Sequence, residues 1–209
     1  ENSVFQGFFR AQNVESVGYI AFGNSNFSGS LNLPSCMYIG NDAFRNSQFT
    51  GSFNCPNVKE IGGQSFYYSQ FDGAFECPNL QAVGTNAFRN SNFTGDFKCP
   101  NLTSVGTNAF LNSVFTGNFN CPNLTSIGNS AFRDSDFTGD FNCPNLTSVG
   151  NEAFLNSNFT KITIGANATL GDGCIGAHSA EFIADYTANN KLAGTYVWDA
   201  DTNHWIYQN

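Results

Sequence analysis

All six prolines of the chain lie 22 residues apart, at Pro34, Pro56, Pro78, Pro100, Pro122 and Pro144. The same period places phenylalanine in three columns, which together hold 21 of the 23 phenylalanines. These columns begin at Phe5, Phe9 and Phe22. A fixed period of this length is typical of a solenoid, in which each repeat forms one coil and buries its apolar side chains on neighbouring coils. The period therefore constrains the architecture strongly and says little about chemistry.

Charged residues make up only 11% of the chain, and the net charge is −8. Asparagine, serine, threonine and glycine supply most of the polar surface, which suits a stack because identical charges in successive coils would repel one another. The eight lysines and arginines form no stripe, so the composition argues against nucleic acid and against an anionic membrane surface. The sequence shows no membrane-spanning run and no signal-peptide core. We expect the targeting or anchoring segment to lie outside this sequence, which starts at Glu1.

Five of the seven cysteines form one column of the repeat. They are Cys55, Cys77, Cys99, Cys121 and Cys143. Leu33 occupies the same position one coil earlier, so cysteine replaces a core leucine and is predicted to be a buried, reduced thiol. Disulfides are less favoured, because side chains in one column of parallel strands point alike. A zinc site is weaker still, because no C-x-x-C motif occurs and both histidines lie outside the repeats.

Residues 93–114 show what one coil contains. Phe97 and Cys99 alternate with polar residues, which predicts a short strand with one buried face. Leu102, Val105 and Phe110 then follow at steps of three to five residues, with Ala109 beside Phe110, which favours a helical or 3-10 arc. The pattern predicts an α/β solenoid of the leucine-rich-repeat type. It would be a horseshoe of 22-residue coils, with short parallel strands on the concave face and helical or 3-10 turns on the convex face. A parallel β-helix is the alternative, although it should show alternation on every face.

The run from Cys121 to Phe132, C-P-N-L-T-S-I-G-N-S-A-F, resembles the BspA-like leucine-rich repeats, also called the Treponema pallidum type. The likeness extends over residues 5 to about 175. The chain departs from the family pattern in three ways: one residue is missing between Pro and Leu, Cys replaces the Leu before Pro, and Ser91 and its equivalents replace a usual Cys. The resemblance implies the fold, surface display and protein binding, and no more specific activity.

The C-terminal segment breaks the period. Ile162 follows Phe159 after three residues instead of four, so one residue is deleted from that turn. We expect residues 1–175 to form the solenoid and residues 176–209 to form a C-terminal cap. The cap would contain a short helix over residues 179–190 and a β-hairpin over residues 195–207. The alternative is a small separate binding module.

The sequence contains no catalytic motif that is distinct from the repeat pattern. Ser91 and its equivalents form a structural column, and His178 and His204 have no supporting triad. We therefore expect no enzymatic activity, no catalytic residue and no cofactor. Asp134, Asp136 and Asp140 cluster without a D-x-D-x-D-G loop, so a solvated acidic edge is favoured over a calcium site.

The concave face is the default binding surface of such a solenoid. Its outward candidates are Glu76, Asp96, Lys98, Asn118, Asn120, Asp140 and Asn142. Tyr67 and Tyr68 are a second candidate, because other coils have Arg-Asn or Leu-Asn there.

These features predict a monomeric, extracellular or cell-surface recognition or adhesion module. It would bind a protein or glycan of a host or a neighbouring cell. A structural spacer is the first alternative. A carbohydrate-binding module is the second, with Tyr67, Tyr68, Trp198 and Trp205 as its available aromatic platforms.

Overall fold

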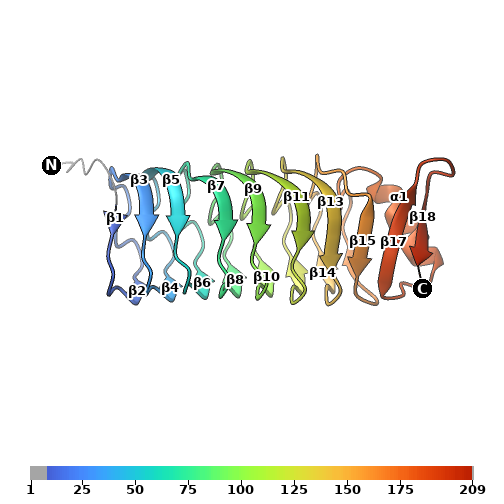
Figure 1. Ribbon diagram of the computed structural model, residues 1–209, viewed down its shortest axis with the longest axis horizontal. Helices are drawn as coiled ribbons and strands as arrows, with labels where there is room; N and C mark the ends of the chain where they lie inside the picture. The colour runs from blue at the N-terminus through green and yellow to red at the C-terminus, as the bar shows by residue number, and fades with distance from the viewer. Residues whose placement is uncertain (1–8, 209) are drawn as a thin grey trace.

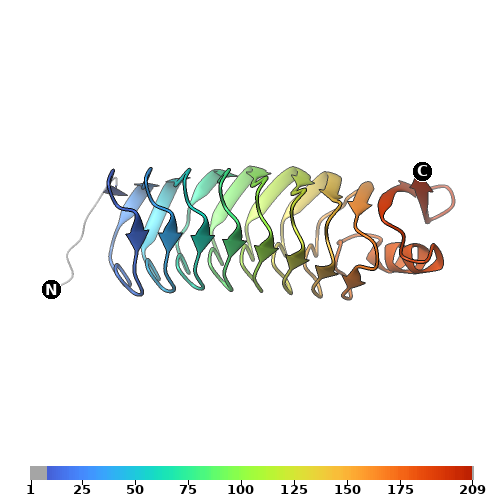
Figure 2. The ribbon, with the colours of Figure 1, turned by 90° about the horizontal axis from the view of Figure 1, so that it is seen from below.

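In the computed structural model, which describes residues 9–208, each coil contributes one longer strand, of which two residues are present in β1, and one two-residue strand. The longer strands lie side by side along one face (Figure 1): β1 (Phe9–Arg10), β3 (Ser28–Asn32), β5 (Gln48–Asn54), β7 (Asp72–Glu76), β9 (Asn92–Lys98), β11 (Val114–Asn120), β13 (Asp136–Cys143) and β15 (Lys161–Ile164). The short strands form a second parallel sheet (Figure 2): β2 (Ser16–Val17), β4 (Tyr38–Ile39), β6 (Glu60–Ile61), β8 (Ala82–Val83), β10 (Ser104–Val105), β12 (Ser126–Ile127), β14 (Ser148–Val149) and β16 (Thr169–Leu170).

The strand register equals the sequence period. Phe75 pairs with Phe97, and Phe97 pairs with Phe119, each 22 residues on. The longer strands divide into a three-stranded sheet, β1-β3-β5, and a seven-stranded sheet that begins at β7 and ends in the C-terminal hairpin. β5 and β7 thus belong to different sheets, and we call the surface that both sheets present the long-strand face.

The predicted helical or 3-10 turns are wrong. Between residues 9 and 178 the chain forms strands and hydrogen-bonded turns and contains no helix of either kind. Val105 lies in the two-residue strand β10, whereas Leu102 and Phe110 lie in the turns on either side of it. A strand of two residues is too short to show alternation in the sequence. The turns on either side also bring apolar residues inward, and the resulting spacing of apolar residues resembles that of a helix.

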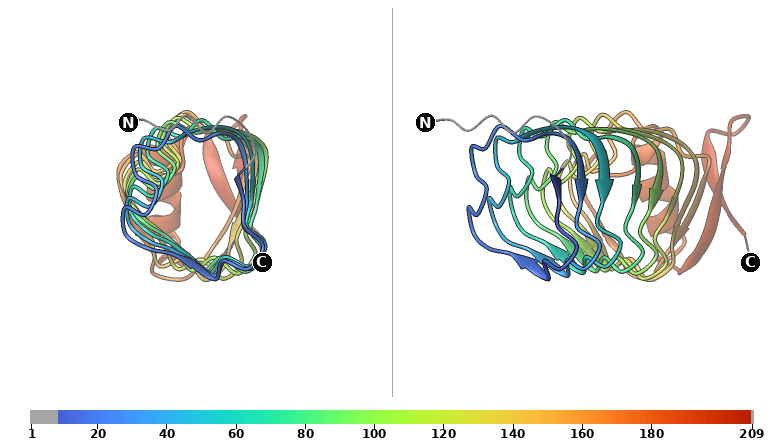
Figure 3. Two further views of the ribbon diagram at one scale, coloured as in Figure 1. Left: turned by 90° about the vertical axis from the view of Figure 1, so that its left-hand side faces the viewer. Right: turned by 60° about the vertical axis from the view of Figure 1, so that its left-hand side comes forward.

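The coils follow a nearly straight axis, which differs from the expected horseshoe (Figures 1 and 2). Sheets on two sides of a coil impose the same spacing of about 4.8 Å between coils. A helical convex side would need about 8–10 Å between neighbouring helices and would bend the stack. The outlines of successive coils accordingly lie almost on one another when viewed near the long axis (Figure 3).

Phenylalanine rings fill the interior of the coils. Within a column the rings stack face to face, as Phe88 does on Phe110 at a centroid distance of 5.2 Å and an interplanar angle of 9°. Rings of different columns meet edge to face, as Phe110 meets Phe115 at 5.7 Å and 73°. Both geometries are favourable for aromatic pairs, so the core is a continuous array along the molecule.

The serine column links successive coils by hydrogen bonds. Ser91 Oγ donates a hydrogen bond to the Ser69 carbonyl at 3.1 Å, and Ser113 Oγ donates to the Ser91 carbonyl at 3.1 Å. These serines are fully buried. Their hydroxyl groups satisfy backbone oxygens that would otherwise lie unpaired in the interior.

The helix and hairpin expected after the repeats are present as α1 (Ser179–Ala188), β17 (Gly194–Asp199) and β18 (His204–Gln208). Phe141 pairs with Ile162, which confirms the one-residue deletion in the last turn. β17 then pairs with β15 in the antiparallel sense, and Tyr186 of α1 donates a hydrogen bond to the Gly165 carbonyl at 2.6 Å. The parallel array therefore ends in an antiparallel hairpin backed by a helix (Figure 1).

We expect Phe119→Ala to lower the free energy of unfolding by about 3–5 kcal/mol. Phe119 is fully buried between Phe97 and Phe141, with centroid distances of 5.5 Å on both sides. Urea denaturation followed by circular dichroism measures the change. Val114→Ala is the control, because Val114 is 40% exposed and its loss should change stability by less than about 0.5 kcal/mol. Equal midpoints for Phe119→Ala and the parent protein would contradict the stacked core.

We expect iodoacetamide to leave the seven thiols unmodified in the folded protein at pH 8. All seven cysteines are free and buried. Burial raises the pKa of the Cys121 and Cys143 thiols, and it raises the pKa of Cys174 to about 11. The reactive thiolate is therefore scarce in the folded state.

Mass spectrometry should find all seven cysteines modified once guanidinium is added without reductant, and protection that persists there would indicate disulfides.

Because burial raises the pKa values of these thiols in the folded state, the thiols contribute fully to stability below the pKa of an exposed thiol, about 8.5. We expect that contribution to fall as the pH rises above this value.

Candidate functional site

The predicted charged residues of the concave face lie on the long-strand face and pair with one another. Lys98 Nζ lies 2.8 Å from Glu76 Oε1 of the preceding coil and 3.2 Å from Asp96 Oδ2. Asp140 Oδ2 lies 2.7 Å from Lys161 Nζ of the following coil. Opposite charges in neighbouring coils thus replace the repulsion that a ladder of like charges would produce.

The predicted asparagines of this face form hydrogen-bonded ladders between coils. Asn142 Nδ2 donates to Asn120 Oδ1 at 2.9 Å. Asn118 Oδ1 accepts a hydrogen bond from the Asp140 backbone N–H at 2.7 Å. Some polar groups of this face therefore form hydrogen bonds between coils, which stabilises the stack.

The two predicted tyrosines lie elsewhere, in the turn between β6 and β7. The ring centroids of Tyr67 and Tyr68 are 4.3 Å apart, and their planes are tilted by 66°. The guanidinium carbon of Arg45 lies 5.9 Å from the Tyr67 ring centroid, and that of Arg89 lies 5.8 Å away. These distances are typical of cation–π contacts. We call Arg45, Tyr67, Tyr68 and Arg89 the aromatic edge.

Tyr68 has a left-handed backbone conformation, at a repeat position where the other coils have asparagine or aspartate. The residues of that column with positive φ are Asn24, Asn46, Tyr68, Asn90, Asn112, Asp134 and Asn156. Asparagine and aspartate tolerate this region, whereas a bulky side chain is strained there. Tyr68 has a φ of 66° and is 54% exposed. Burial in the core therefore does not compensate the strain.

The same substitution interrupts an asparagine ladder. Asn46 Nδ2 donates to Asn24 Oδ1 at 2.8 Å, and Asn112 Nδ2 donates to Asn90 Oδ1 at 2.6 Å. Tyr68 stands between Asn46 and Asn90 and offers no amide to either. A side-chain hydrogen bond with Tyr67 raises the pKa of Tyr68.

A hollow of about 480 Å³ lies beside Tyr68. Its lining residues are Ser28, Asn46, Gln48, Thr50, Tyr68 and Gln70. They come from β3, β5 and the turns before β5 and β7, around the break between the two sheets of the long-strand face. We call this hollow the Tyr68 pocket. All six lining side chains are uncharged at neutral pH. Five carry a hydroxyl or a primary amide, and the sixth is the phenol ring of Tyr68.

A smaller hollow of about 300 Å³ adjoins the Tyr68 pocket and shares Asn46 with it. Tyr19 and Ile20 line it and are 71% and 45% exposed. Ile20 has a φ of 53°, which is unusual for a β-branched residue. Arg45 also lines this hollow and lies 3.3 Å from Asp42 in an ion pair. The exposed Tyr19 and Ile20 thus line a hollow next to the Tyr68 pocket.

The sequence prediction named Tyr67 and Tyr68 and did not include Arg45, Arg89 or the glutamines, which the structure places beside them. Arg45, Tyr67 and Arg89 occupy one column of the repeat, so their proximity follows from the 22-residue register. A comparison of this column in successive coils would therefore have placed the two arginines beside Tyr67.

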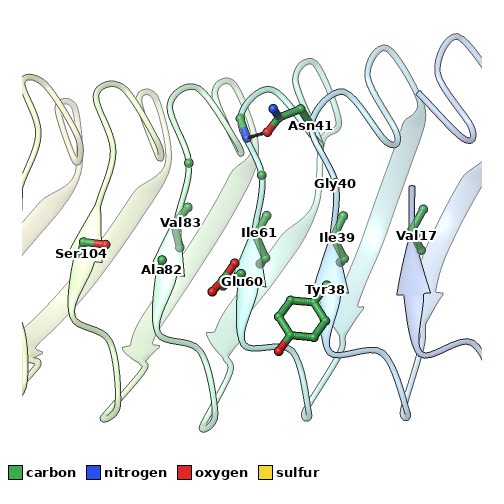
Figure 4. Close-up of a pocket in the computed structure, with 13 residues that line it drawn as sticks. Val17, Tyr38, Ile39, Gly40, Asn41, Glu60, Ile61, Ala82, Val83 and Ser104 are labelled. Atoms are coloured by element: carbon green, nitrogen blue, oxygen red, sulfur yellow. Dashed lines mark hydrogen bonds between the residues drawn. The ribbon is translucent and has the colours of Figure 1, made fainter. Parts of the chain in front are cut away.

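A third hollow, of about 600 Å³, is a trough on the short-strand sheet (Figure 4). Ile39, Ile61 and Val83 form its floor and are almost fully buried. Its depth comes from glycines such as Gly84, where an added Cβ would lie 2.4 Å from the Gly63 nitrogen of the preceding coil. Close packing of the coils therefore explains this trough, and few side chains converge on it.

Among residues 9–208, no group of three or more His, Cys, Asp or Glu side chains is placed to hold a metal ion. The same range contains no helix that is long and apolar enough to span a bilayer. Of the two tryptophans considered as platforms, Trp205 is buried and Trp198 stacks on His178 at 3.8 Å.

A family model described as BspA type Leucine rich repeat region matches the chain in six copies, over residues 2–94 and 59–179. Comparison with curated proteins and with solved structures gives no match for this chain. The family match extends over most of the chain and agrees with the stacked coils, which confirms the resemblance carried by the C-P-N-L-x-x-[IV]-G-x-x-A-F run. The chain belongs to the BspA-type leucine-rich-repeat family.

Proposed function

We propose that the chain is a non-enzymatic recognition module, secreted or displayed at a cell surface, that binds a macromolecule of another cell through the aromatic edge. Membership of a leucine-rich-repeat family supports an interaction role. The repeated serines donate hydrogen bonds to backbone carbonyls of neighbouring coils, which supports a structural role for that column.

The observation that carries this proposal is the left-handed backbone of the exposed Tyr68. The rest of the described column holds asparagine or aspartate and bears no such strain. Strained residues that the surrounding structure maintains are concentrated at ligand-binding and active sites. A tyrosine that costs stability and gains no burial is best explained by contact with a partner.

The chemistry of the aromatic edge suits protein or glycan recognition. Tyrosine and arginine are the residues that most often dominate binding energy at interfaces. The long-strand face contrasts with this arrangement, because many of its polar groups already bond one another.

The long-strand face favours one alternative, a spacer that displays another domain. Its ion pairs and amide ladders would serve a stiff rod without any ligand. A spacer has no use for an exposed, strained tyrosine, however. The two functions differ in whether the aromatic edge matters for binding.

We expect Tyr68→Asn to raise the free energy of unfolding by about 1 kcal/mol. The substitution removes the strain and restores an amide between Asn46 and Asn90. Urea denaturation measures the change. Asn112→Tyr is the matched reverse substitution in the same column, and it should lower stability by a similar amount. If Tyr68→Asn destabilised the protein, the tyrosine would have a structural role and the proposal would lose its main support.

We expect fluorescently labelled protein to bind intact epithelial cells saturably, and the double variant Tyr67→Leu/Tyr68→Asn to lose that binding. The variant recreates the Leu111-Asn112 sequence that another coil tolerates, so the fold should persist. Flow cytometry gives the binding curve. Leu111→Arg is the control, because arginine is native to that column, and its binding should be unchanged. Equal saturable binding by the double variant and the parent protein would mean that recognition uses another surface, and no binding by either protein would favour the spacer.

A further inference from the structure

We propose that the Tyr68 pocket binds a neutral saccharide unit, with the Tyr68 ring as its platform. This inference rests on the proposed function and names the ligand class of the same site. It goes beyond a general macromolecular partner, because the pocket lining itself selects the chemistry.

The size of the Tyr68 pocket is appropriate for a small sugar. Its volume of about 480 Å³ lies within the range of roughly 300–1,000 Å³ that is typical of small-molecule sites. It is open to solvent at the exposed Tyr68, so the terminal units of a longer glycan could enter without burial of the whole chain.

The lining groups match the two faces of a pyranose ring. The faces of a sugar ring carry C–H groups that pack on an aromatic ring, and Tyr68 supplies such a surface at the rim. The edges carry vicinal hydroxyl groups that both donate and accept hydrogen bonds. Asn46, Gln48 and Gln70 carry primary amides, which have two donors and an acceptor and can satisfy adjacent hydroxyls together. Thr50 adds a hydroxyl that can take either role.

The charge of the lining selects a neutral ligand. The six lining residues include no carboxylate and no cationic group. Arg45, the cation of the adjoining hollow, is paired with Asp42 at 3.3 Å and also lies over Tyr67. A sialylated or sulfated sugar would therefore find no dedicated counter-ion in the pocket.

The combination of lining residues occurs at one place among the described coils. Gln48 and Gln70 occupy one column in successive coils, next to Tyr68. The following coils have Asn92, Val114 and Asp136 in that column, with asparagine or aspartate in place of the tyrosine. Stacking of the coils does not require two glutamines beside the one tyrosine of that column.

The backbone that carries the pocket is held by bonds between coils. The Asn46 N–H donates to the Tyr67 carbonyl at 2.8 Å, and the Gln70 N–H donates to the Phe49 carbonyl at 2.7 Å. The Asn46 side chain is oriented by its bond to Asn24. The pocket is therefore preorganised in part, which lowers the entropic cost of binding a weak, polar ligand.

The test uses isothermal titration of the purified protein with lactose, maltose, mannobiose and N,N′-diacetylchitobiose. We expect at least one of these neutral disaccharides to bind, with an affinity that varies little between about 50 and 500 mM NaCl. Tyr68→Asn and Gln70→Val should each weaken it by about tenfold or more. Both replacements are native to their columns in other coils, so folding should be retained. Asp136→Asn, in the Gln70 column, is the control and should leave affinity unchanged.

The outcomes separate this inference from the proposed function. If no disaccharide binds and periodate oxidation of the cells leaves protein binding intact, the saccharide inference fails. Loss of cell binding in the Tyr67→Leu/Tyr68→Asn variant would then still support recognition, of a protein surface. Saccharide binding that survives both pocket substitutions, or that requires a sialylated or sulfated sugar, would also overturn the inference. Disaccharide binding that both substitutions weaken would support it, whether or not the cells chosen carry that sugar.

Discussion

Each coil of this protein must return to the same position after 22 residues, because its phenylalanine rings stack on those of the coils before and after it. The rings of one column lie about as far apart as neighbouring strands in a sheet, so stacking and strand pairing reinforce one another: Phe88 and Phe110 are 5.2 Å apart. A coil with one residue more or fewer would move every ring out of its column. The single deletion, before Ile162, occurs where the chain begins its last coil and the hairpin follows.

The same register determines the surface. Any outward side chain meets its own equivalent in the next coil, so only residues that tolerate an identical neighbour can be repeated freely. Asparagine meets this condition because one amide donates to the next, as Asn142 does to Asn120. Charges appear where the neighbouring coil has the opposite sign, as in the Glu76–Lys98 pair. The low content of charged residues is therefore a consequence of stacking and carries little information about a partner.

The sequence predicted the parts of the fold that depend on the period. The long strands and the buried cysteine column followed from residues such as Phe97 and Cys99. The C-terminal helix and hairpin were predicted separately, from the non-repeating residues 176–209. The convex arc was mistaken for a helix because Val105 lies in a strand of only two residues, in which alternation cannot be seen. The straight axis follows from that second sheet, so one error in the local structure became an error in the overall shape.

The candidate site could be predicted only in part, for a related reason. Tyr67 and Tyr68 are visible in the sequence as departures from a column, but the meaning of the departure depends on the backbone. Asparagine is frequent at this position because the position is left-handed, and this fact makes Tyr68 strained instead of merely unusual. The Tyr68 pocket also lies at the break between β5 and β7, which the sequence period does not reveal. In a repeat protein the periodic residues explain the scaffold, and function is best sought where an exposed residue breaks a column at a cost that the scaffold does not require.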